Sequence, residues 1–444
     1  MKKVRDLTEG SIVGGFVMFA LPLFGGSLFQ QLYSTVDMLF VGNILGKNAA
    51  AAIGASGILV TCLINLFTGI AVGAGIVIAQ LFGAKKEEEL KDAVWVSILA
   101  GAVGGIFLMC TGFYLARYVL ALLNTPEVLM EDALLYVRIY FLATVSMILY
   151  NMCAGILRAQ GDSRTPFFVL AVGGILNVFM DGIFLIQLEK GVEGVAFATL
   201  ISQTFTAAAL LIHIFRRSSH LLRRNIRWDL LRRIVRLGLP VGIQSMILTL
   251  SNVIVQYHIN GFGEDAMAAF AVYFKAEHLL CLPIMAFGQA MVTFTGQNFG
   301  AHRLERIRKG IISCNGIAAA VIVVIAGVSL RFGPWLLGAF CPDEAVVENG
   351  MRIISVTFPL YFLYSFFEVT GGVIRGIGKS LSSMVIVITN LCLVRILLLE
   401  IFDRLFHSIE SIAAVYPITW FLALASFAGY YVYVCRGGRE LAES

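Results

Sequence analysis

Two carboxylates lie deep within segments of this sequence that are otherwise apolar enough to cross a membrane. Asp37 stands in QQLYSTVDMLFVG, about six residues before the end of the apolar segment 13–43, and Asp181 lies about as far from the end of segment 167–187. Six residues of helix rise by roughly 9 Å, so we expect both carboxyl groups at the same depth. An ionisable group inside a membrane is costly, which makes each of them a candidate for ion binding.

Two neutral polar side chains are expected at that depth as well. Asn177 precedes Asp181 by four residues and so shares its helical face, and Thr199 lies about seven residues into segment 192–215. Together with the two carboxylates, these side chains would form an oxygen-rich pocket. Such a pocket suits a proton shared by the carboxylates or Na⁺ bound at Asp37 and Asp181. Simpler interpretations stay open: Asp37 as a hydrogen-bonded buried acid, Asp181 as a solvated group near the membrane surface, and the other two as polar contacts between helices.

The second half of the chain carries a different set of polar residues in its apolar segments. The seventh segment contains no acid near the position that matches Asp37, although Gln256 is close by. Lys275 and Glu277 are two residues apart and therefore point in different directions on a helix. Glu368 matches Asn151 in the duplication described below. These positions are possible substrate contacts or secondary coupling groups, and the charged ones could instead form structural ion pairs.

The composition indicates which elements position these residues. Of 444 residues, 59% are hydrophobic and only 14% are charged, which is more apolar surface than one soluble core can bury. About twelve apolar segments are long enough to cross roughly 30 Å of hydrocarbon. We therefore predict an all-α polytopic membrane protein with twelve transmembrane helices.

An internal duplication divides these helices into two halves. Three sequence motifs each return about 217 residues later, and each half contributes six helices, so both halves start on the same side of the membrane. We predict two six-helix lobes related by a pseudo-two-fold axis along the membrane normal, an arrangement typical of secondary transporters. The repeated motifs are AQLFGAKK at 79–86 and GQNFGAHR at 296–303, GILRAQGDS at 155–163 and GVIRGIGKS at 372–380, and Leu21-Pro22 and Leu239-Pro240.

Lysine and arginine are distributed unevenly between the two sides of the predicted membrane. Both termini and the even-numbered connections carry 24 of them, and the opposite side carries six. Basic connections stay in the cytoplasm, so we predict a multi-pass protein of the cell (inner) membrane with both termini cytoplasmic. The predicted lobes are 1–215 and 237–444, joined by the basic cytoplasmic linker 216–236. We interpret this linker as a segment resting on anionic lipid headgroups and not as a nucleic-acid site.

Motifs of other functional classes are missing from the sequence. The eight cysteines form no CxxC pair, and the six histidines lack the spacing of metal ligands. Gly378-Lys379-Ser380 resembles the end of a phosphate-binding loop, but Val373 stands where that loop requires glycine. We therefore predict no enzymatic activity, no resident metal and no cofactor, and the coupling ion is expected to be Na⁺ or H⁺.

The chain resembles the multidrug and toxic compound extrusion (MATE) family in the ordered motifs LP, QQLYSTVDMLFVG, AAIG, GILRAQGD, NVFMD, GVEGVAFAT and GQNFGAHR. The resemblance covers almost the whole chain and implies a twelve-helix transporter that exchanges cytoplasmic drugs or metabolites for external Na⁺ or H⁺. It implies that Asp37, Asn177, Asp181 and Thr199 form a cation site in the N-terminal lobe. Some members carry an acid on the seventh helix, which this sequence lacks, and this favours coupling in the N-terminal lobe. Glu277 resembles an acid on the eighth helix of many bacterial members.

We therefore expect a secondary active antiporter that exports amphipathic, often cationic, drugs or metabolites in exchange for Na⁺ or H⁺. The 33 Phe and 14 Met could provide apolar and cation–π contacts for such molecules. A flippase of lipid-linked saccharide precursors is the alternative, and it would need cationic residues in its cavity, for which Lys275 and Arg395 are the main candidates. The expected partners are a small organic substrate and the lipid bilayer, without nucleic acid, and we expect a monomer.

Overall fold

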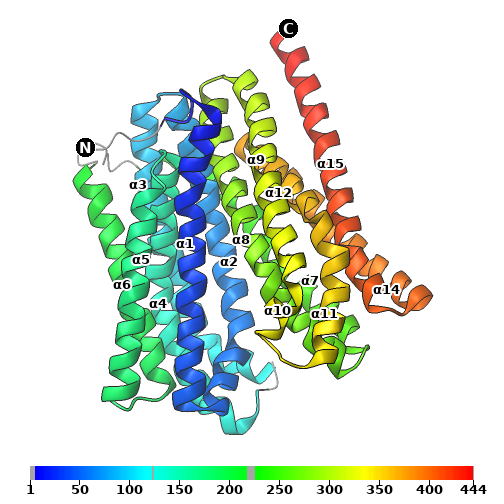
Figure 1. Ribbon diagram of the computed structural model, residues 1–444. Coiled ribbons are helices and arrows are strands. Elements are labelled where there is room, and N and C mark those ends of the chain that lie inside the picture. Colours follow the sequence, from blue (N-terminus) through cyan, green and yellow to red (C-terminus); the bar gives the residue numbers. More distant parts are fainter. Residues whose placement is uncertain (1–5, 123–124, 218–225, 444) are drawn as a thin grey trace. The chain divides into compact units, whose positions relative to one another are not determined.

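The computed structural model describes the backbone of residues 6–122, 125–217 and 226–443 (Figure 1) and most of their side chains, the main exceptions being 47–63 and 435–443. These residues are almost entirely helical, and no strand occurs among them. Twelve of the described helical segments are long and apolar enough to cross a membrane. The predicted all-α fold with twelve membrane-spanning helices is confirmed. Residues 218–225 of the predicted linker lie outside the described residues.

Six of the twelve spans come from each half of the chain. The elements of the first half are α1 (Ile12–Phe40), a π-helical turn (Val41–Leu45), α2 (Lys47–Gly83), α3 (Glu87–Leu122), α4 (Glu127–Ala159), α5 (Arg164–Gly182), a second π-helical turn (Ile183–Gln187) and α6 (Val192–Arg217). Those of the second half are α7 (Trp228–Asn260), α8 (Glu264–Gly300), α9 (Leu304–Arg331), α10 (Gly333–Gly338), α11 (Glu344–Thr357), a 3-10 turn (Phe358–Leu360), α12 (Tyr361–Gly376), α13 (Ser380–Ile388), a π-helical stretch (Thr389–Val394), α14 (Arg395–Phe406) and α15 (Ile409–Glu443).

The chain folds into two compact units whose limits differ from the predicted lobes. Unit 1 is built mainly from Leu21–Met246, and unit 2 from Leu7–Ala20 and the chain from Ile247 onward. Helices α1 and α7 are therefore each divided between the two units. In α1 the division falls beside Pro22, one of the prolines inside the helices. The division of function between lobes 1–215 and 237–444 stays a prediction.

In unit 1, the first half of α7 packs closely against α2 through two glycine pairs. A Cβ atom added to Gly69 would lie 2.2 Å from the backbone nitrogen of Gly242, and one added to Gly73 would lie 2.5 Å from that of Gly238. In each helix the two glycines are four residues apart, so they form one small-residue stripe. The contact holds the buried side of α7 at Leu230, Ile234 and Leu237 and leaves the opposite side of its first turns exposed.

In unit 2, the repeated motif GQNFGAHR holds the segment that precedes α1. The backbone N–H of Leu7 donates to Gln297 Oε1 over 2.9 Å, and Asn298 Nδ2 donates to the Leu7 carbonyl over 3.2 Å. Arg306 donates to the Glu9 carbonyl over 2.8 Å, so several hydrogen bonds fix this short segment. Its counterpart motif AQLFGAKK supplies Gln80 in unit 1, whose Oε1 accepts from Arg233 at the start of α7. Each copy of the motif thus binds the chain near the start of another helix: the second copy binds the segment before α1, and the first copy binds the start of α7.

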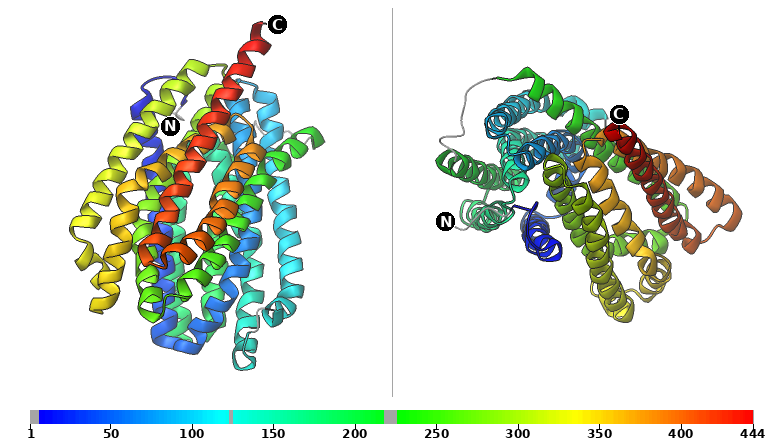
Figure 2. Two further views of the ribbon diagram at one scale, coloured as in Figure 1. Left: turned by 90° about the vertical axis from the view of Figure 1, so that its right-hand side faces the viewer. Right: turned by 90° about the horizontal axis from the view of Figure 1, so that it is seen from above.

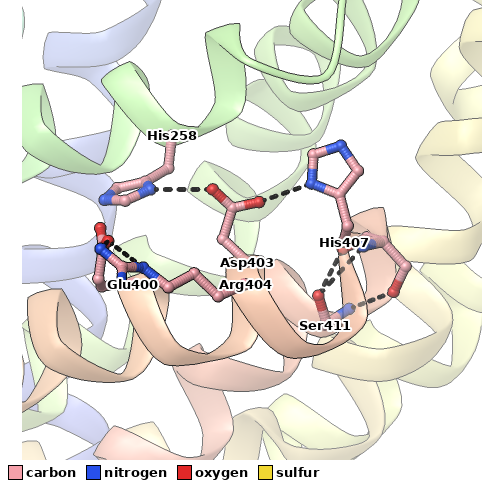
Figure 3. A network of polar contacts seen from close by, with 7 residues as sticks. His258, Glu400, Asp403, Arg404, His407 and Ser411 are labelled. Carbon is pink, nitrogen blue, oxygen red and sulfur yellow. Dashed lines mark hydrogen bonds and ion pairs between the residues drawn. The ribbon is translucent and has the colours of Figure 1, made fainter.

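The C-terminal helices pack against one another within unit 2. Helix α15, drawn in red, runs beside α12 and α14 (Figure 2). A polar network joins the end of α7 to the connection between α14 and α15 (Figure 3). The Asp403 carboxylate lies between two imidazoles, 3.5 Å from His258 Nδ1 and 2.9 Å from His407 Nδ1. His407 also stacks on the Phe262 ring at 4.7 Å, so side chains fasten three separate segments at this end of the unit.

Candidate cation-binding site

Helices α1 and α5 lie side by side in unit 1 (Figure 1), and glycines of each helix face aromatic rings of the other. A Cβ atom at Gly25 of α1 would lie 3.1 Å from the Phe167 ring, and one at Gly174 of α5 would lie 2.9 Å from the Tyr33 ring. Further along both helices, polar side chains come together. Each helix then ends in a π-helical turn a few residues beyond its carboxylate. Such turns interrupt regular backbone pairing and are frequent at functional sites.

Three of the predicted site residues meet at this contact. The carboxyl groups of Asp37, on α1, and Asp181, on α5, lie close enough to interact with each other. The Asn177 amide lies one turn before Asp181, and its nitrogen donates to the two Asp37 oxygens over 3.1 and 3.2 Å in the orientation that satisfies both groups. Asn177 and Asp181 are fully buried, and Asp37 is partly exposed.

The Asp181 carboxylate has no hydrogen-bond donor among the described residues. Both of its oxygens are buried, and the polar group that contacts it is the other carboxyl. Two carboxylates accept hydrogen bonds but cannot donate to each other unless one is protonated. A buried pair of negative charges is strongly unfavourable without a partner. A proton on one of the two carboxyl groups, or a small cation beside them, would remove this unfavourable charge.

Tyrosines surround the carboxyl pair, and the sequence interpretation did not include them. Tyr33 interacts with both Asp37 and Gln203, and Tyr136 interacts electrostatically with both carboxylates. Tyr140 is the neighbour of Tyr136 on α4, with ring centroids 5.8 Å apart. Helical spacing could have found some of them, because Tyr33 precedes Asp37 by four residues and Gln203 follows Thr199 by four.

Thr199 was predicted to belong to this site, but its hydroxyl forms a hydrogen bond within its own helix. Its hydroxyl donates to the Val195 carbonyl over 3.1 Å within α6. Helix α6 packs against α5, but among the described contacts the Thr199 side chain pairs with its own helix. The prediction that Thr199 contributes to cation binding is therefore not supported by a hydrogen bond to either carboxyl.

An apolar groove lies between the same two helices, and its lining residues do not include either carboxylate. It has a volume of about 630 Å³ and lies between α1 and α5, where Tyr33 and Val36 face Gly174, Val178 and Gly182. Its walls are nearly all apolar, and its volume is within the range of small-molecule sites. A molecule in this groove would contact Val36 and Gly182, the sequence neighbours of the two carboxylates.

Glu277 of unit 2 is held by tyrosine hydroxyls. Its Oε1 accepts from Tyr361 over 2.6 Å and from Tyr273 over 3.3 Å, and the Tyr361 oxygen also lies 3.3 Å from Cys281 Sγ. Arg395 also interacts electrostatically with this carboxylate. Glu277 thus lies in a buried aromatic region with permanent donors around it.

Glu368 forms an ion pair with Arg375 of the same helix, α12. The two side chains are 14% and 8% exposed, so this is a nearly buried pair. Arg375 therefore lies inside the protein, although its position in the sequence suggested a cytoplasmic connection. The contact supports the structural alternative for Glu368.

The remaining predicted residues form local contacts. Asn151 Nδ2 donates to the Met147 carbonyl over 2.9 Å, and Gln256 donates to Asn260 over 2.8 Å. Lys275 is exposed on α8 and lies 5.6 Å from the centroid of the Phe340 ring. These residues lie apart from the carboxyl pair in the described contacts, and none of them shares a partner with Glu277 or Glu368.

Comparison with known proteins identifies the family of this chain. The MatE family model matches residues 22–183 and 240–399, which are the two halves of the chain and contain both carboxylates. The chain belongs to the MatE family. The resemblance seen in the sequence motifs is thereby confirmed.

Individual relatives of this MATE chain are similar along most of their length. It is 29% identical to the "Probable multidrug resistance protein YoeA" of Bacillus subtilis (strain 168), covering 97% of this chain and 95% of that protein. It is 24% identical to the "Multidrug export protein MepA" of Staphylococcus aureus (strain NCTC 8325 / PS 47), covering 83% of each. The fold matches the outward-facing structure of a multidrug resistance MATE family transporter of the MOP superfamily, with a TM-score of 0.92, 21% identity and 98% of both chains covered.

Proposed function

We propose that this MATE protein is a secondary active antiporter that exports amphipathic, often cationic, organic molecules in exchange for Na⁺ or H⁺. The proposal rests on the closeness of the Asp37 and Asp181 carboxyl groups. Both Asp181 oxygens are buried and receive no hydrogen bond from the described residues. A group that needs a cation, and that is reached through the partly exposed Asp37, can bind and release that cation during transport.

The chemistry of the pair accommodates either coupling ion. A proton would bridge the two carboxyl oxygens as an O–H donor. Na⁺ would be held by carboxylate oxygens, with the Asn177 amide turned so that its oxygen is a further hard ligand. Neither ion is a resident cofactor in this proposal, because transport requires its release. A change of helix packing follows only if the cation binds one conformation more tightly than the other.

The groove beside the pair supports the proposed substrate class. Its apolar walls suit the hydrocarbon part of an amphipathic molecule, and a cationic group would be attracted by the neighbouring carboxylates. Substrate and coupling cation would then compete for the same negative charge, which produces exchange. The relatives named as multidrug resistance and multidrug export proteins agree with this substrate class.

The flippase alternative receives less support from the described side chains. Lys275 is exposed beside the Phe340 ring, and Arg395 is buried over the Tyr416 ring at 4.7 Å. Both cationic candidates thus have aromatic partners in the protein. We propose a location in the bacterial cell membrane with both termini in the cytoplasm, from the lysine and arginine distribution.

Efflux measurements in everted membrane vesicles test the proposal. A Na⁺ gradient and a pH gradient are imposed separately, and the movement of a fluorescent organic cation is followed for the native protein and for Asp37→Asn. We expect one gradient to drive transport and Asp37→Asn to reduce the driven rate by at least about a hundredfold, because the variant removes the charge that the cation must neutralise.

The matched control is Asp132→Asn, which removes an exposed carboxylate of α4 and is expected to leave transport and membrane insertion unchanged. Full driven efflux by Asp37→Asn would disprove the role of the pair. If the native protein moves the cation with neither gradient, antiport is wrong and the flippase alternative gains.

A further inference from the structure

We propose that the first turns of α7 bind one anionic phospholipid, with its phosphate on Arg232 and Arg236. The site is a shallow open groove of about 460 Å³ in unit 1, lined by Trp228, Leu231, Arg232, Val235 and Arg236. The proposal concerns lipid recognition and does not depend on the transported substrate or the coupling ion.

The spacing of the lining residues places them on one face of the helix. Trp228, Arg232 and Arg236 follow one another at intervals of four, and all three are exposed. The opposite face, with Leu230 and Ile234, is buried. The basic face is therefore fixed in position by the packing of the helix and is available to an external partner.

The two arginines in the groove differ from their neighbours on α7, which have partners within the protein. Arg227 pairs with Asp229 over 2.6 Å, and Arg233 donates to Gln80 Oε1 over 2.5 Å. Arg232 and Arg236 have no hydrogen bond or ion pair with any other residue that the structure describes. Two like charges at this spacing destabilise a helix, and an anion between them removes that repulsion. A phosphate fits because guanidinium groups bind its oxygens in pairs.

A second basic groove of the molecule shows the contrasting case. It lies in unit 2 at the start of α9, and its Arg303 and Arg306 donate to backbone carbonyls of the segment before α1. Those guanidinium groups are already occupied by the protein. The comparison indicates that the α7 groove, with its two available guanidinium groups, is built for an external anion.

The apolar residues of the groove identify the anion as a phospholipid headgroup. Leu231 and Val235 alternate with the arginines, and Leu239, one turn further into the predicted membrane, is 39% exposed. These side chains offer a surface for an acyl chain, while Trp228, which is 71% exposed, is typical of the membrane interface. The Lys/Arg distribution predicts that this end of α7 faces the cytoplasmic leaflet, where anionic lipids attract basic groups.

Native mass spectrometry of the full chain in detergent tests the site. The protein is titrated with dioleoyl phosphatidylglycerol or dioleoyl phosphatidylcholine, and the first bound lipid is counted. We expect the native protein to prefer phosphatidylglycerol and Arg232→Gln/Arg236→Gln to weaken its first binding step about thirtyfold, from the usual contribution of two basic residues. The control Arg308→Gln/Lys379→Gln removes the same charge from exposed positions elsewhere and should change binding less than threefold.

Three outcomes would overturn the proposal: equal binding of the two lipids, equal losses in both double variants, or displacement of phosphatidylglycerol by millimolar inorganic phosphate, which would indicate a free-anion site. A second measurement does not depend on the double variant. The part of the tryptophan fluorescence that is lost in Trp228→Phe should be quenched about three times more by brominated phosphatidylglycerol than by brominated phosphatidylcholine at equal low mole fraction. Equal quenching by the two brominated lipids would also contradict the site.

Discussion

The carboxylates inside the apolar helices of the two units differ in the groups that stabilise them. In unit 1, Asp37 and Asp181 contact each other, and Asp181 receives no donor from the described residues. In unit 2, Glu368 pairs with Arg375 and Glu277 accepts from two tyrosine hydroxyls. Permanent protein partners make a carboxylate part of the structure, whereas a pair without them needs an exchangeable cation. From this difference we propose that coupling takes place in unit 1 and that the acids of unit 2 have a structural role.

The largest stability effect is expected in unit 2, at the Glu368–Arg375 pair. Arg375→Met leaves the nearly buried Glu368 without its positive partner, which should lower the free energy of unfolding by about 3–5 kcal/mol. Thermal unfolding in detergent measures the loss. The double variant Glu368→Gln/Arg375→Met should recover a large part of it, since no unpaired charge remains. A small effect of the single variant would mean that the pair is not structural.

A change of opposite sign is expected in unit 1. Asp181→Asn replaces a buried carboxylate that lacks a donor with an amide that can donate to Asp37, so the protein should become more stable by about 2 kcal/mol in alkaline buffer without Na⁺. The same unfolding measurement gives the value. The stability difference between Asp181→Asn and the native protein should become smaller when the coupling cation is added, because the cation neutralises the carboxyl pair of the native protein. Destabilisation under both conditions would remove the distinction between the two units.

A smaller effect is expected at Glu277. Tyr361→Phe removes the shorter of its two tyrosine hydrogen bonds while Tyr273 continues to donate, so the cost should be about 1 kcal/mol. Driven transport per folded molecule should stay within about twofold of the native rate. A loss of transport as complete as that of Asp37→Asn would show that Glu277 takes part in coupling and that unit 2 is not only structural.

Much of the fold could be predicted from the sequence because membrane helices carry a strong local signal. Apolar length, the repeated motifs and the basic connections indicated twelve spans in two halves, since the bilayer imposes these features on each segment separately. The division of α1 and α7 between the two units was not predictable in the same way. It depends on contacts such as those between Gly69 and Gly242, which join segments far apart in the chain.

The candidate site was predicted in part for a related reason. Asp37, Asn177 and Asp181 could be selected from the sequence because polar groups inside apolar helices are rare. Their distances from the ends of the apolar segments predicted that they lie at the same depth in the membrane. Tyr33 and Tyr136 were missed because tyrosine is common in apolar segments and gives no such signal. The partner of Glu368 was also missed, because Arg375 at the end of α12 resembles an ordinary basic residue beside a membrane.

The most direct test of the exchangeable cation is to count the ions that substrate displaces from the purified protein. The full chain in weakly buffered detergent solution is mixed with an organic cation that it transports, while a pH-sensitive dye follows released protons and, in a separate sample, bound radioactive Na⁺ is measured. We predict the release of about one cation per native molecule and none from Asp37→Asn or Asp181→Asn. Release of the same amount from the two variants would contradict the assignment of coupling to the Asp37–Asp181 pair.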